Sequence, residues 1–254
     1  MKVAVALSGG GARCAAQLGY IEVLQSKFSL HIESLSGSSA GAIVAAFLAK
    51  GLQPAAIMDT LLSFPYHKIK FNFFRGTLWT LEPVLEELEN LGLRSFDELQ
   101  KTLYITLTPY DNCKPAYKTS GNLARSVLAS SALLPLFAPI TIDGQKYIDG
   151  GFCDNLPITP LKKHRLFTIA INVNPTQNIK FPFSFFGNFK RAGFLLLNSN
   201  IRSSIPLADK YIEILECQNF GILERKKLET IYDAGKAQAY KDLEEWEKIF
   251  MKNS

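Results

Sequence analysis

The sequence predicts an α/β protein with three layers, in which a mostly parallel β-sheet is covered by helices on both faces. Three observations lead to this prediction. Short apolar runs of strand length alternate with stretches of helical periodicity, the order expected of β-α-β units. The first apolar run, Val3–Leu7, is continuous rather than alternating, as in strands buried on both faces. Two strand-to-helix turns, Gly9–Gly11 and Gly37–Gly41, are rich in glycine.

The composition favours one globular domain spanning residues 1–254. Hydrophobic residues make up 47% of the chain and charged residues 20%, as in folded rather than disordered proteins. The net charge of +5 fits binding to anionic surfaces, and it also serves solubility alone. No apolar run approaches the roughly 18 residues that cross a bilayer, and Val3–Leu7 is too short for a signal peptide. We therefore expect a cytoplasmic protein, with peripheral membrane association as its only membrane contact.

The cysteines and histidines form neither a disulfide framework nor a metal site. They are far apart and include no Cys-x-x-Cys pair, so free thiols in a reducing compartment are expected. We expect no metal and no cofactor. The residues concerned are Cys14, Cys113, Cys153, Cys217, His31, His67 and His164.

The first half of the chain is expected to alternate strands and helices. Pro54 suits the first turn of a helix, and Ser95 with Glu98 has the capping-box pattern. Phe64–Trp79 has neither period, so we expect a loop or a cover over the sheet. Strands are expected at Lys2–Leu7, His31–Ser36 and Tyr104–Pro109, the last paired with Ala116–Thr119. Helices are expected from after Arg13 to about Ser26, and at Ala40–Lys50, Pro54–Ser63, Leu81–Leu91 and Ser95–Lys101.

The second half continues the same alternation. Asp143-Gly144 predicts the turn of a hairpin. Phe181–Phe189 is an aromatic cluster whose proline, serine and glycine make it too irregular for an ordinary core helix. Strands are expected at Ile140–Ile142, Lys146–Ile148, Leu166–Val173 and Tyr211–Leu215. Helices are expected at Leu123–Ser131 and, as one amphipathic helix, at Leu228–Phe250.

The segment Gly37–Gly41 has the Gly-x-Ser-x-Gly pattern of a nucleophile elbow. Its flanking glycines remove Cβ atoms that would clash where the backbone reverses from strand to helix. This places Ser39 at the apex, with a helix N-terminus behind it that favours a developing oxyanion. By itself the pattern also fits an ordinary close-packed strand–helix crossing.

The loop Gly9–Gly11 exposes consecutive N–H groups that can hold a phosphate or an oxyanion. A nucleotide-binding domain is therefore an alternative function. The dinucleotide pattern requires glycine where this chain has Cys14, although Glu33 stands at the distance of the acidic residue. No Gly-Lys-Ser/Thr follows, so the P-loop pattern is absent.

Three motifs in this order, Gly9–Arg13, Gly37–Gly41 and Asp149–Gly151, resemble the signatures of patatin-like phospholipases. The resemblance extends over nearly the whole chain. The family usually carries glycine where this chain has Cys14. Supporting matches are Ala129–Ala132 with Pro135 and Phe137, Asn155–Pro157, Ala208-Asp209 and Asp233–Gly235.

The resemblance implies a patatin-like fold and a serine lipid acyl hydrolase of the phospholipase A or lysophospholipase kind. Ser39 would attack an ester carbonyl, and Asp149 would accept its proton. An unperturbed aspartate, with a pKa of about 3.9, is a weak base, so the site would have to raise that value. Arg13 would orient the loop, contact a lipid phosphate, or form an ion pair on a helix face. The oxyanion hole would comprise Gly9, Gly10, Gly11 and Ala40.

The same residues allow two other interpretations, a catalytic triad with histidine and a non-catalytic lipid-binding protein. A triad of Ser39, Asp149 and His164 has the hydrolase order, but His164 precedes a strand, whereas α/β active sites lie at the carboxyl ends of strands. His31 also precedes its strand, so the same argument applies to it. His67 lies in the stretch Phe64–Trp79, to which this argument does not apply. A non-catalytic lipid-binding protein on the same fold would be free to lose Ser39 or Asp149, and both are present.

The expected partner is a phospholipid or another acyl lipid, with no nucleic acid and no obligate protein partner. Phenylalanines at short spacing are more often core than membrane-facing. Phe181–Phe189 is nevertheless flanked by Lys180, Lys190 and Arg191, which suits an entrance for lipid from an anionic membrane. We therefore place this stretch, with part of Phe64–Trp79, at the mouth above Ser39.

Overall fold

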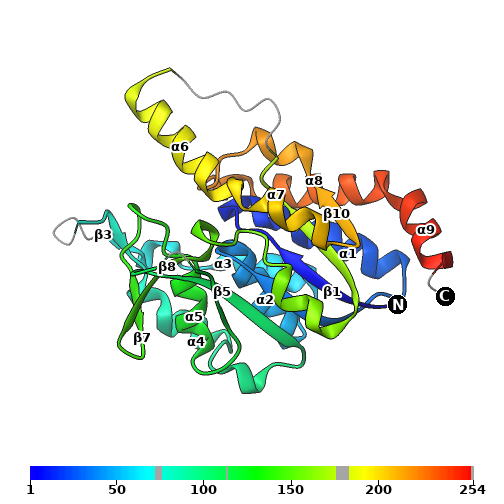
Figure 1. Cartoon of the computed structure of the whole chain (residues 1–254), viewed down its shortest axis with the longest axis horizontal. Helices are drawn as coiled ribbons and strands as arrows, with labels where there is room; N and C mark the ends of the chain where they lie inside the picture. Colours follow the sequence, from blue (N-terminus) through cyan, green and yellow to red (C-terminus); the bar gives the residue numbers. More distant parts are fainter. Residues whose placement is uncertain (72–75, 113, 176–182, 253–254) are drawn as a thin grey trace.

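The computed structural model describes residues 1–71, 76–112, 114–175 and 183–252 (Figure 1). Within these residues, eight strands form one sheet in the order β10-β9-β1-β2-β5-β8-β7, with β6 beside β5. The neighbouring strands β10, β9, β1, β2 and β5 pair in parallel. The pairs β5–β6, β5–β8 and β8–β7 are antiparallel. They are β1 (Lys2–Leu7), β2 (His31–Gly37), β5 (Thr102–Pro109), β6 (Ala116–Lys118), β7 (Ile140–Ile142), β8 (Gln145–Asp149), β9 (Phe167–Asn172) and β10 (Lys210–Glu213).

Helices lie on both sides of the sheet, which confirms the predicted fold class (Figure 1). Strand β1 has the pattern of a strand buried on both faces. Val3, Val5 and Leu7 belong to the larger core, whereas Ala4 and Ala6 belong to a smaller one on the other face. The helices are α1 (Ala15–Lys27), α2 (Ala40–Lys50), α3 (Pro54–Ser63), α4 (Leu85–Asn90), α5 (Leu123–Ser130), α6 (Phe185–Ser199), α7 (Ile201–Ser204), α8 (Leu228–Lys241) and α9 (Leu243–Lys252).

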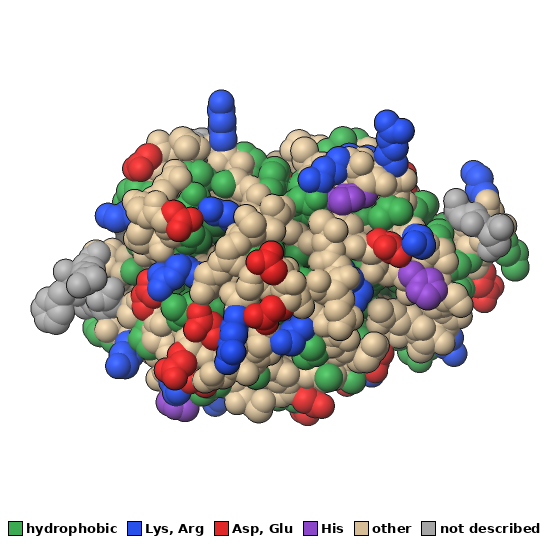
Figure 2. All heavy atoms as spheres, turned by 90° about the horizontal axis from the view of Figure 1, so that it is seen from below, with side chains coloured by type: hydrophobic (Ala, Val, Ile, Leu, Met, Phe, Trp, Pro, Cys, Tyr) green, Lys and Arg blue, Asp and Glu red, His purple; other side chains and the backbone are tan. Residues whose placement is uncertain are grey.

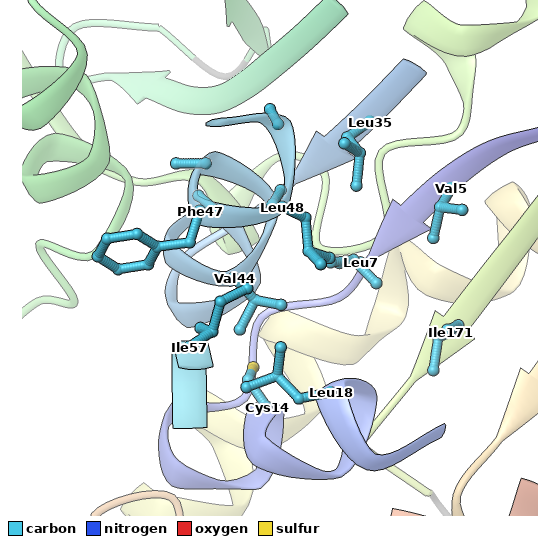
Figure 3. Close-up of a cluster of buried hydrophobic side chains, with 14 of the residues drawn as sticks. Val5, Leu7, Cys14, Leu18, Leu35, Val44, Phe47, Leu48, Ile57 and Ile171 are labelled. Atoms are coloured by element: carbon cyan, nitrogen blue, oxygen red, sulfur yellow. The ribbon is translucent and has the colours of Figure 1, made fainter. Parts of the chain in front are cut away.

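The larger core lies between the sheet and the helices α1 and α2 (Figure 3). Its side chains include Leu7 from β1, Leu18 from α1 and Phe47 from α2, all almost fully buried. Burying a side chain of this size contributes about 1.5–3 kcal/mol. Cys14 lies in the same cluster, and its Sγ donates to the backbone oxygen of Ser8 at 3.4 Å. The residue that departs from the family pattern is therefore a packed core thiol.

The C-terminal helix predicted at Leu228–Phe250 is wrong in one respect, because it is divided into α8 and α9 at Asp242. The Asp242 carboxylate accepts hydrogen bonds from Tyr20 Oη at 2.8 Å and from Gln238 Nε2 at 3.0 Å. Trp246 Nε1 donates to the same Tyr20 hydroxyl at 2.8 Å. These bonds tie the junction to α1. The apolar spacing on either side of Asp242 gave no sign of it.

The helix predicted at Ser95–Lys101 is also wrong, because only a 3-10 turn forms there, at Phe96–Glu98. The Ser95 hydroxyl accepts from the N–H of Asp97 at 3.1 Å, not from that of Glu98. The N–H groups of Gln100 and Lys101 both donate to the backbone oxygen of Ala49. Tertiary hydrogen bonds have therefore replaced the ones that a helix would make. The expected helix Leu81–Leu91 begins with a 3-10 turn at Glu82–Val84, ahead of α4.

In the stretch Phe64–Trp79 the described residues form only short elements, as expected from its lack of a period. They are a 3-10 turn at Tyr66–Lys68 and the two-stranded pair β3 (Lys70–Phe71) and β4 (Trp79–Thr80). Residues 72–75 lie outside the described part of the chain.

One face of the molecule carries interspersed charge, and no described helix suits a membrane span. On the face seen in Figure 2, basic and acidic side chains alternate rather than gather by sign. Among the described residues, no helix is both long enough and apolar enough to cross a bilayer.

Candidate active site

Ser39 lies in the turn between β2 and α2, as the N-cap of that helix. Its backbone has φ 52° and ψ −130°, a conformation that costs a non-glycine residue about 1–3 kcal/mol. A strained serine between a strand and a helix is the geometry of a nucleophile elbow. The backbone strain is thus located at the residue whose hydroxyl lies at the turn.

Asp149 ends β8 and meets Ser39 across the sheet from a position 110 residues further along the chain. Ser39 Oγ donates a hydrogen bond of 2.6 Å to Asp149 Oδ2. The other carboxylate oxygen, Oδ1, accepts from the N–H of Gly151 at 2.8 Å. Asp149 is 2% exposed, so both its oxygens are held within the protein and its orientation is fixed.

Burial raises the pKa of Asp149 from its usual 3.8 to about 6, because the charged form loses its hydration. The hydrogen bonds from Ser39 and from the N–H of Gly151 act in the opposite direction, but they are the smaller effects. The carboxylate is thus a stronger base than an exposed aspartate, and it is still mostly ionised at neutral pH.

Ser130 contacts the elbow directly, although its sequence position indicated no specific role. Its hydroxyl accepts from the backbone N–H of Ser39 at 2.8 Å and donates to the backbone oxygen of Thr106 at 2.7 Å. It thereby joins the strained elbow to strand β5. The available signal was the family-like segment Ala129–Ala132, which contains Ser130. The neighbouring Ser38 is buried, and no hydrogen-bond partner for its hydroxyl is found among the described residues.

The glycine loop packs directly against the elbow. A Cβ on Gly9 would lie 2.8 Å from Ser39 Cβ and 2.5 Å from Asn155 Oδ1, so only glycine fits. The N–H of Gly9 donates at 3.1 Å both to the backbone oxygen and to the side-chain oxygen of Asn155. It is thus directed to Asn155, and not toward a substrate as expected for the oxyanion hole.

Gly11 adopts φ 58°, in the left-handed region, and a Cβ there would lie 2.1 Å from the backbone oxygen of Ile222. Gly10 lies between Gly9 and Gly11, with Val173 beside it. Ala40 is the first residue of α2 and follows Ser39 directly. Gly9 and Ala40 thus both adjoin Ser39, the first by packing against its Cβ and the second in sequence.

Asn155 and Asn200 connect the Asp149 turn to the rest of the site. The N–H of Asn155 donates to Asn200 Oδ1 at 2.9 Å, and Asn200 Nδ2 donates to the backbone oxygen of Gly151 at 2.9 Å. With the Gly9–Asn155 bonds, this holds the glycine loop and the Asp149 turn together. The motif Asn155–Pro157 was recognised in the sequence, but Asn200 carried no signal.

Arg13 is 7% exposed, and its Nε donates to the backbone oxygen of Phe220 at 2.7 Å. Burial lowers the pKa of its guanidinium from the usual value, because the charged form is desolvated. Among the described residues no carboxylate forms an ion pair with it. Of the three expected roles, orienting the loop is the one that matches these contacts.

The histidines lie away from the Ser39–Asp149 pair. His31 begins β2, and about six residues of extended strand, near 3.3 Å each, separate it from Gly37 at the other end. His164 Nε2 lies 2.8 Å from the hydroxyl of Tyr104, three residues before β9 begins. His67 lines a separate surface hollow with Leu62 and Arg225.

Comparisons with known proteins agree on one family. A family model described as "Patatin-like phospholipase" matches residues 5–162. "Lysophospholipase nte1" of Aspergillus terreus is 30% identical over an alignment of 175 residues, which covers 63% of this chain and 11% of that protein. "Lysophospholipase NTE1" of Debaryomyces hansenii is 26% identical over an alignment of 187 residues, which covers 69% of this chain and 12% of that protein. The chain thus matches only about a tenth of the length of these relatives.

A solved structure is similar over most of the chain. VipD from Legionella pneumophila superposes with a TM-score of 0.52 at 16% identity, covering 94% of this chain and 67% of that one. At this identity the similarity concerns the fold.

Proposed function

Because the chain belongs to the patatin-like phospholipase family, we propose that it hydrolyses carboxylic ester bonds of phospholipids or related acyl lipids. The observation that carries this proposal is the 2.6 Å hydrogen bond from Ser39 Oγ to the buried carboxylate of Asp149. The lysophospholipase names of its relatives support the same class of substrate. The proposal treats residues 1–254 as one catalytic domain.

In the first half-reaction, Ser39 Oγ attacks the ester carbonyl carbon while its proton passes to Asp149 Oδ2. The negative charge that develops on the carbonyl oxygen is stabilised by the N–H groups of Gly10, Gly11 and Ala40. Asp149 then returns the proton to the alcohol oxygen as the bond to the acyl carbon breaks. An acyl-serine and a free alcohol result.

In the second half-reaction, a water molecule attacks the acyl carbon and gives a proton to Asp149. Collapse of this intermediate releases the fatty acid, and the proton returns to Ser39 Oγ. The raised pKa of Asp149, about 6, makes it a better acceptor of the proton from Ser39 and from water than an ordinary aspartate is. Gly9 and Arg13 contribute by spacing and orienting the loop, since their polar groups bond to Asn155 and Phe220.

A fluorophosphonate probe tests the nucleophile directly. We expect it to label Ser39 alone, because Ser39 is the serine whose hydroxyl is bonded to a buried base. Mass spectrometry of the digested protein locates the adduct, and Ser39→Ala is the control that should abolish it. An adduct on Ser38, or no adduct on a folded protein, would contradict the proposal; the second result would favour a non-catalytic lipid-binding protein.

We further propose that α6 contacts an anionic membrane. Figure 1 shows this helix projecting from the body of the protein. Phe183, just before it, is 97% exposed, and Leu195 and Leu196 are 52% and 61% exposed. No Asp or Glu occurs between Asp154 and Asp209. Within α6 the charged residues are Lys190 and Arg191, both basic.

Such a combination of exposed apolar side chains with only basic charge is typical of helices that lie on a membrane surface. Helix α6 also contacts the turn Gly150–Phe152, which follows Asp149 directly. Of the aromatic cluster expected at the mouth, residues 181 and 182 lie outside the described residues, as do the side chains of Phe185, Phe186 and Phe189.

The variant Leu195→Ser/Leu196→Ser should bind vesicles of phosphatidylcholine and phosphatidylglycerol at least tenfold more weakly than the wild type. Each inserted leucine contributes about 1.5–3 kcal/mol when fully buried. Vesicle co-sedimentation measures the binding, and hydrolysis of a soluble short-chain ester should be unchanged. The matched control is Leu91→Ser/Met251→Ser, which removes two exposed apolar side chains elsewhere. Equal weakening in both variants, or a loss of thermal stability in the first, would contradict membrane contact by α6.

A further inference from the structure

A surface hollow of about 340 Å³ lies between the end of α3 and the start of α8. Neither Ser39 nor Asp149 lines it, so the proposed mechanism leaves it unused. Its lining is partly apolar and partly basic. Leu62, Phe64, Tyr66 and Leu228 supply the apolar part, and Arg225 with Lys226 supplies the basic part, which we call the rim; His67 completes the lining.

The two cations of the rim are available for an external anion. Their neighbour Lys227 forms an ion pair with Glu224 at 2.6 Å. In the part of the chain that the structure describes, no such carboxylate partner is found for Arg225 or Lys226. The Arg225 guanidinium lies 5.0 Å from the centre of the Tyr66 ring. This contact packs the guanidinium against the ring. Among the described residues no hydrogen bond from this guanidinium is found, so its N–H groups can bind an anion through two parallel hydrogen bonds.

The loop that carries this rim is bonded to the glycine loop of the active site. The backbone oxygen of Ile222 accepts from the N–H of Ala12 at 2.8 Å. The backbone oxygen of Phe220 accepts from Arg13 Nε at 2.7 Å. Arg225 follows Ile222 by three residues, a reach of about 11 Å at most. The segment that carries Arg225 and Lys226 is thus anchored to the glycine loop, although the hollow itself is separate from Ser39.

We propose that this hollow binds the phosphate group of a phospholipid. The phosphate accepts hydrogen bonds from Arg225 and Lys226, and the glycerol with the first acyl carbons lies against Leu62, Phe64 and Leu228. The planar guanidinium matches the geometry of a phosphate, and the apolar side matches the part of a lipid that free phosphate lacks. The choice of a lipid rests on the proposed function, whereas the anion-binding rim does not.

The test compares three probes on Ser39→Ala and on the wild type by isothermal titration calorimetry. They are a dihexyl-ether phosphatidylglycerol, which cannot be hydrolysed at an ester, the same dihexyl glycerol without phosphate, and inorganic phosphate. We expect the diether phospholipid to bind at least tenfold more tightly than either of the others. Arg225→Gln/Lys226→Gln should weaken it at least tenfold, because two charge-assisted contacts are lost. Leu62→Ser should weaken the diether phospholipid and leave inorganic phosphate unaffected.

The matched control is Lys27→Gln/Lys248→Gln, which removes the same charge from two exposed sites elsewhere. Equal weakening in this control would mean a general charge effect and would overturn the proposal. So would unchanged binding in a folded Arg225→Gln/Lys226→Gln, or phosphate and phospholipid binding alike, which would indicate a site for a free anion.

Failure of the proposed lipid-binding hollow can be distinguished from failure of the proposed hydrolase function. A protein that hydrolyses no ester but binds the diether phospholipid through Arg225 and Lys226 supports the hollow and contradicts the hydrolase. An active hydrolase whose phospholipid binding ignores these two residues contradicts the hollow alone.

Discussion

Ser39→Ala and Asp149→Asn are each expected to lower the turnover of a soluble short-chain ester by at least about three orders of magnitude. Nucleophile and base act as a unit, so losing either removes the covalent route. Alanine has no attacking oxygen. Asparagine cannot accept the Ser39 proton, although it keeps the shape of the carboxylate and can still accept from the N–H of Gly151. Steady-state hydrolysis of a chromogenic ester, with intact folding shown by circular dichroism, measures the effect.

The histidines provide the control for this experiment. His31→Ala, His67→Ala and His164→Ala should each remain within about tenfold of the wild type, equivalent to about 1.4 kcal/mol or less. The reason is that both oxygens of Asp149 are already occupied, by Ser39 and by the N–H of Gly151. A folded histidine variant as inactive as Ser39→Ala would show that a triad, not a dyad, performs the reaction.

Asp149→Asn should also make the protein more stable at neutral pH, by about 3 kcal/mol. Burial raises the pKa of this carboxyl from 3.8 to about 6, and a change of that size corresponds to about 3 kcal/mol. The folded protein therefore holds the proton more tightly than the unfolded chain does. Its stability decreases as the pH rises from about 4 to about 6, and above that the full cost of the buried charge is present. Asparagine carries no charge and avoids this cost.

Thermal unfolding at pH 4 and at pH 7.5, followed by circular dichroism, checks this prediction. The thermal midpoint of the variant should exceed that of the wild type by about 6–12 °C at pH 7.5, and most of this difference should be lost at pH 4. Asp233→Asn, at an exposed position, should change the free energy of unfolding by less than about 0.5 kcal/mol at either pH. If Asp149→Asn instead destabilises the protein at pH 7.5, the site stabilises the charged form of this carboxyl group, and the prediction is wrong.

The predicted losses of activity and the predicted gain in stability have one cause, which is the burial of the Asp149 carboxylate. The buried carboxylate lowers the stability of the fold, and the same burial gives it the basicity that the proposed reaction requires. The backbone of Ser39 also lowers the stability of the fold, because its positive φ is unfavourable for a residue other than glycine. This strain lies at the position where the proposed reaction needs the hydroxyl.

The sequence by itself determined the fold class and the local elements, because these depend on interactions between near neighbours in the chain. The continuous apolar run of β1 and the small-residue helix α2, ended by Gly51 with φ 99°, follow from period and capping. The position of Ser39 in a strand-to-helix turn likewise follows from five consecutive residues. The spacing of motifs along the chain was enough to identify the family.

Only the tertiary structure decided which distant groups meet. The break at Asp242 depends on the hydroxyl of Tyr20, and the orientation of the Gly9 N–H depends on Asn155. The link of the elbow to β5 depends on Ser130, and the raised pKa of Asp149 depends on its burial. Each of these is an interaction between segments that are remote in sequence, so its energy is set by packing and desolvation. No local pattern records those quantities, and they are what turn an ordinary aspartate into a candidate base.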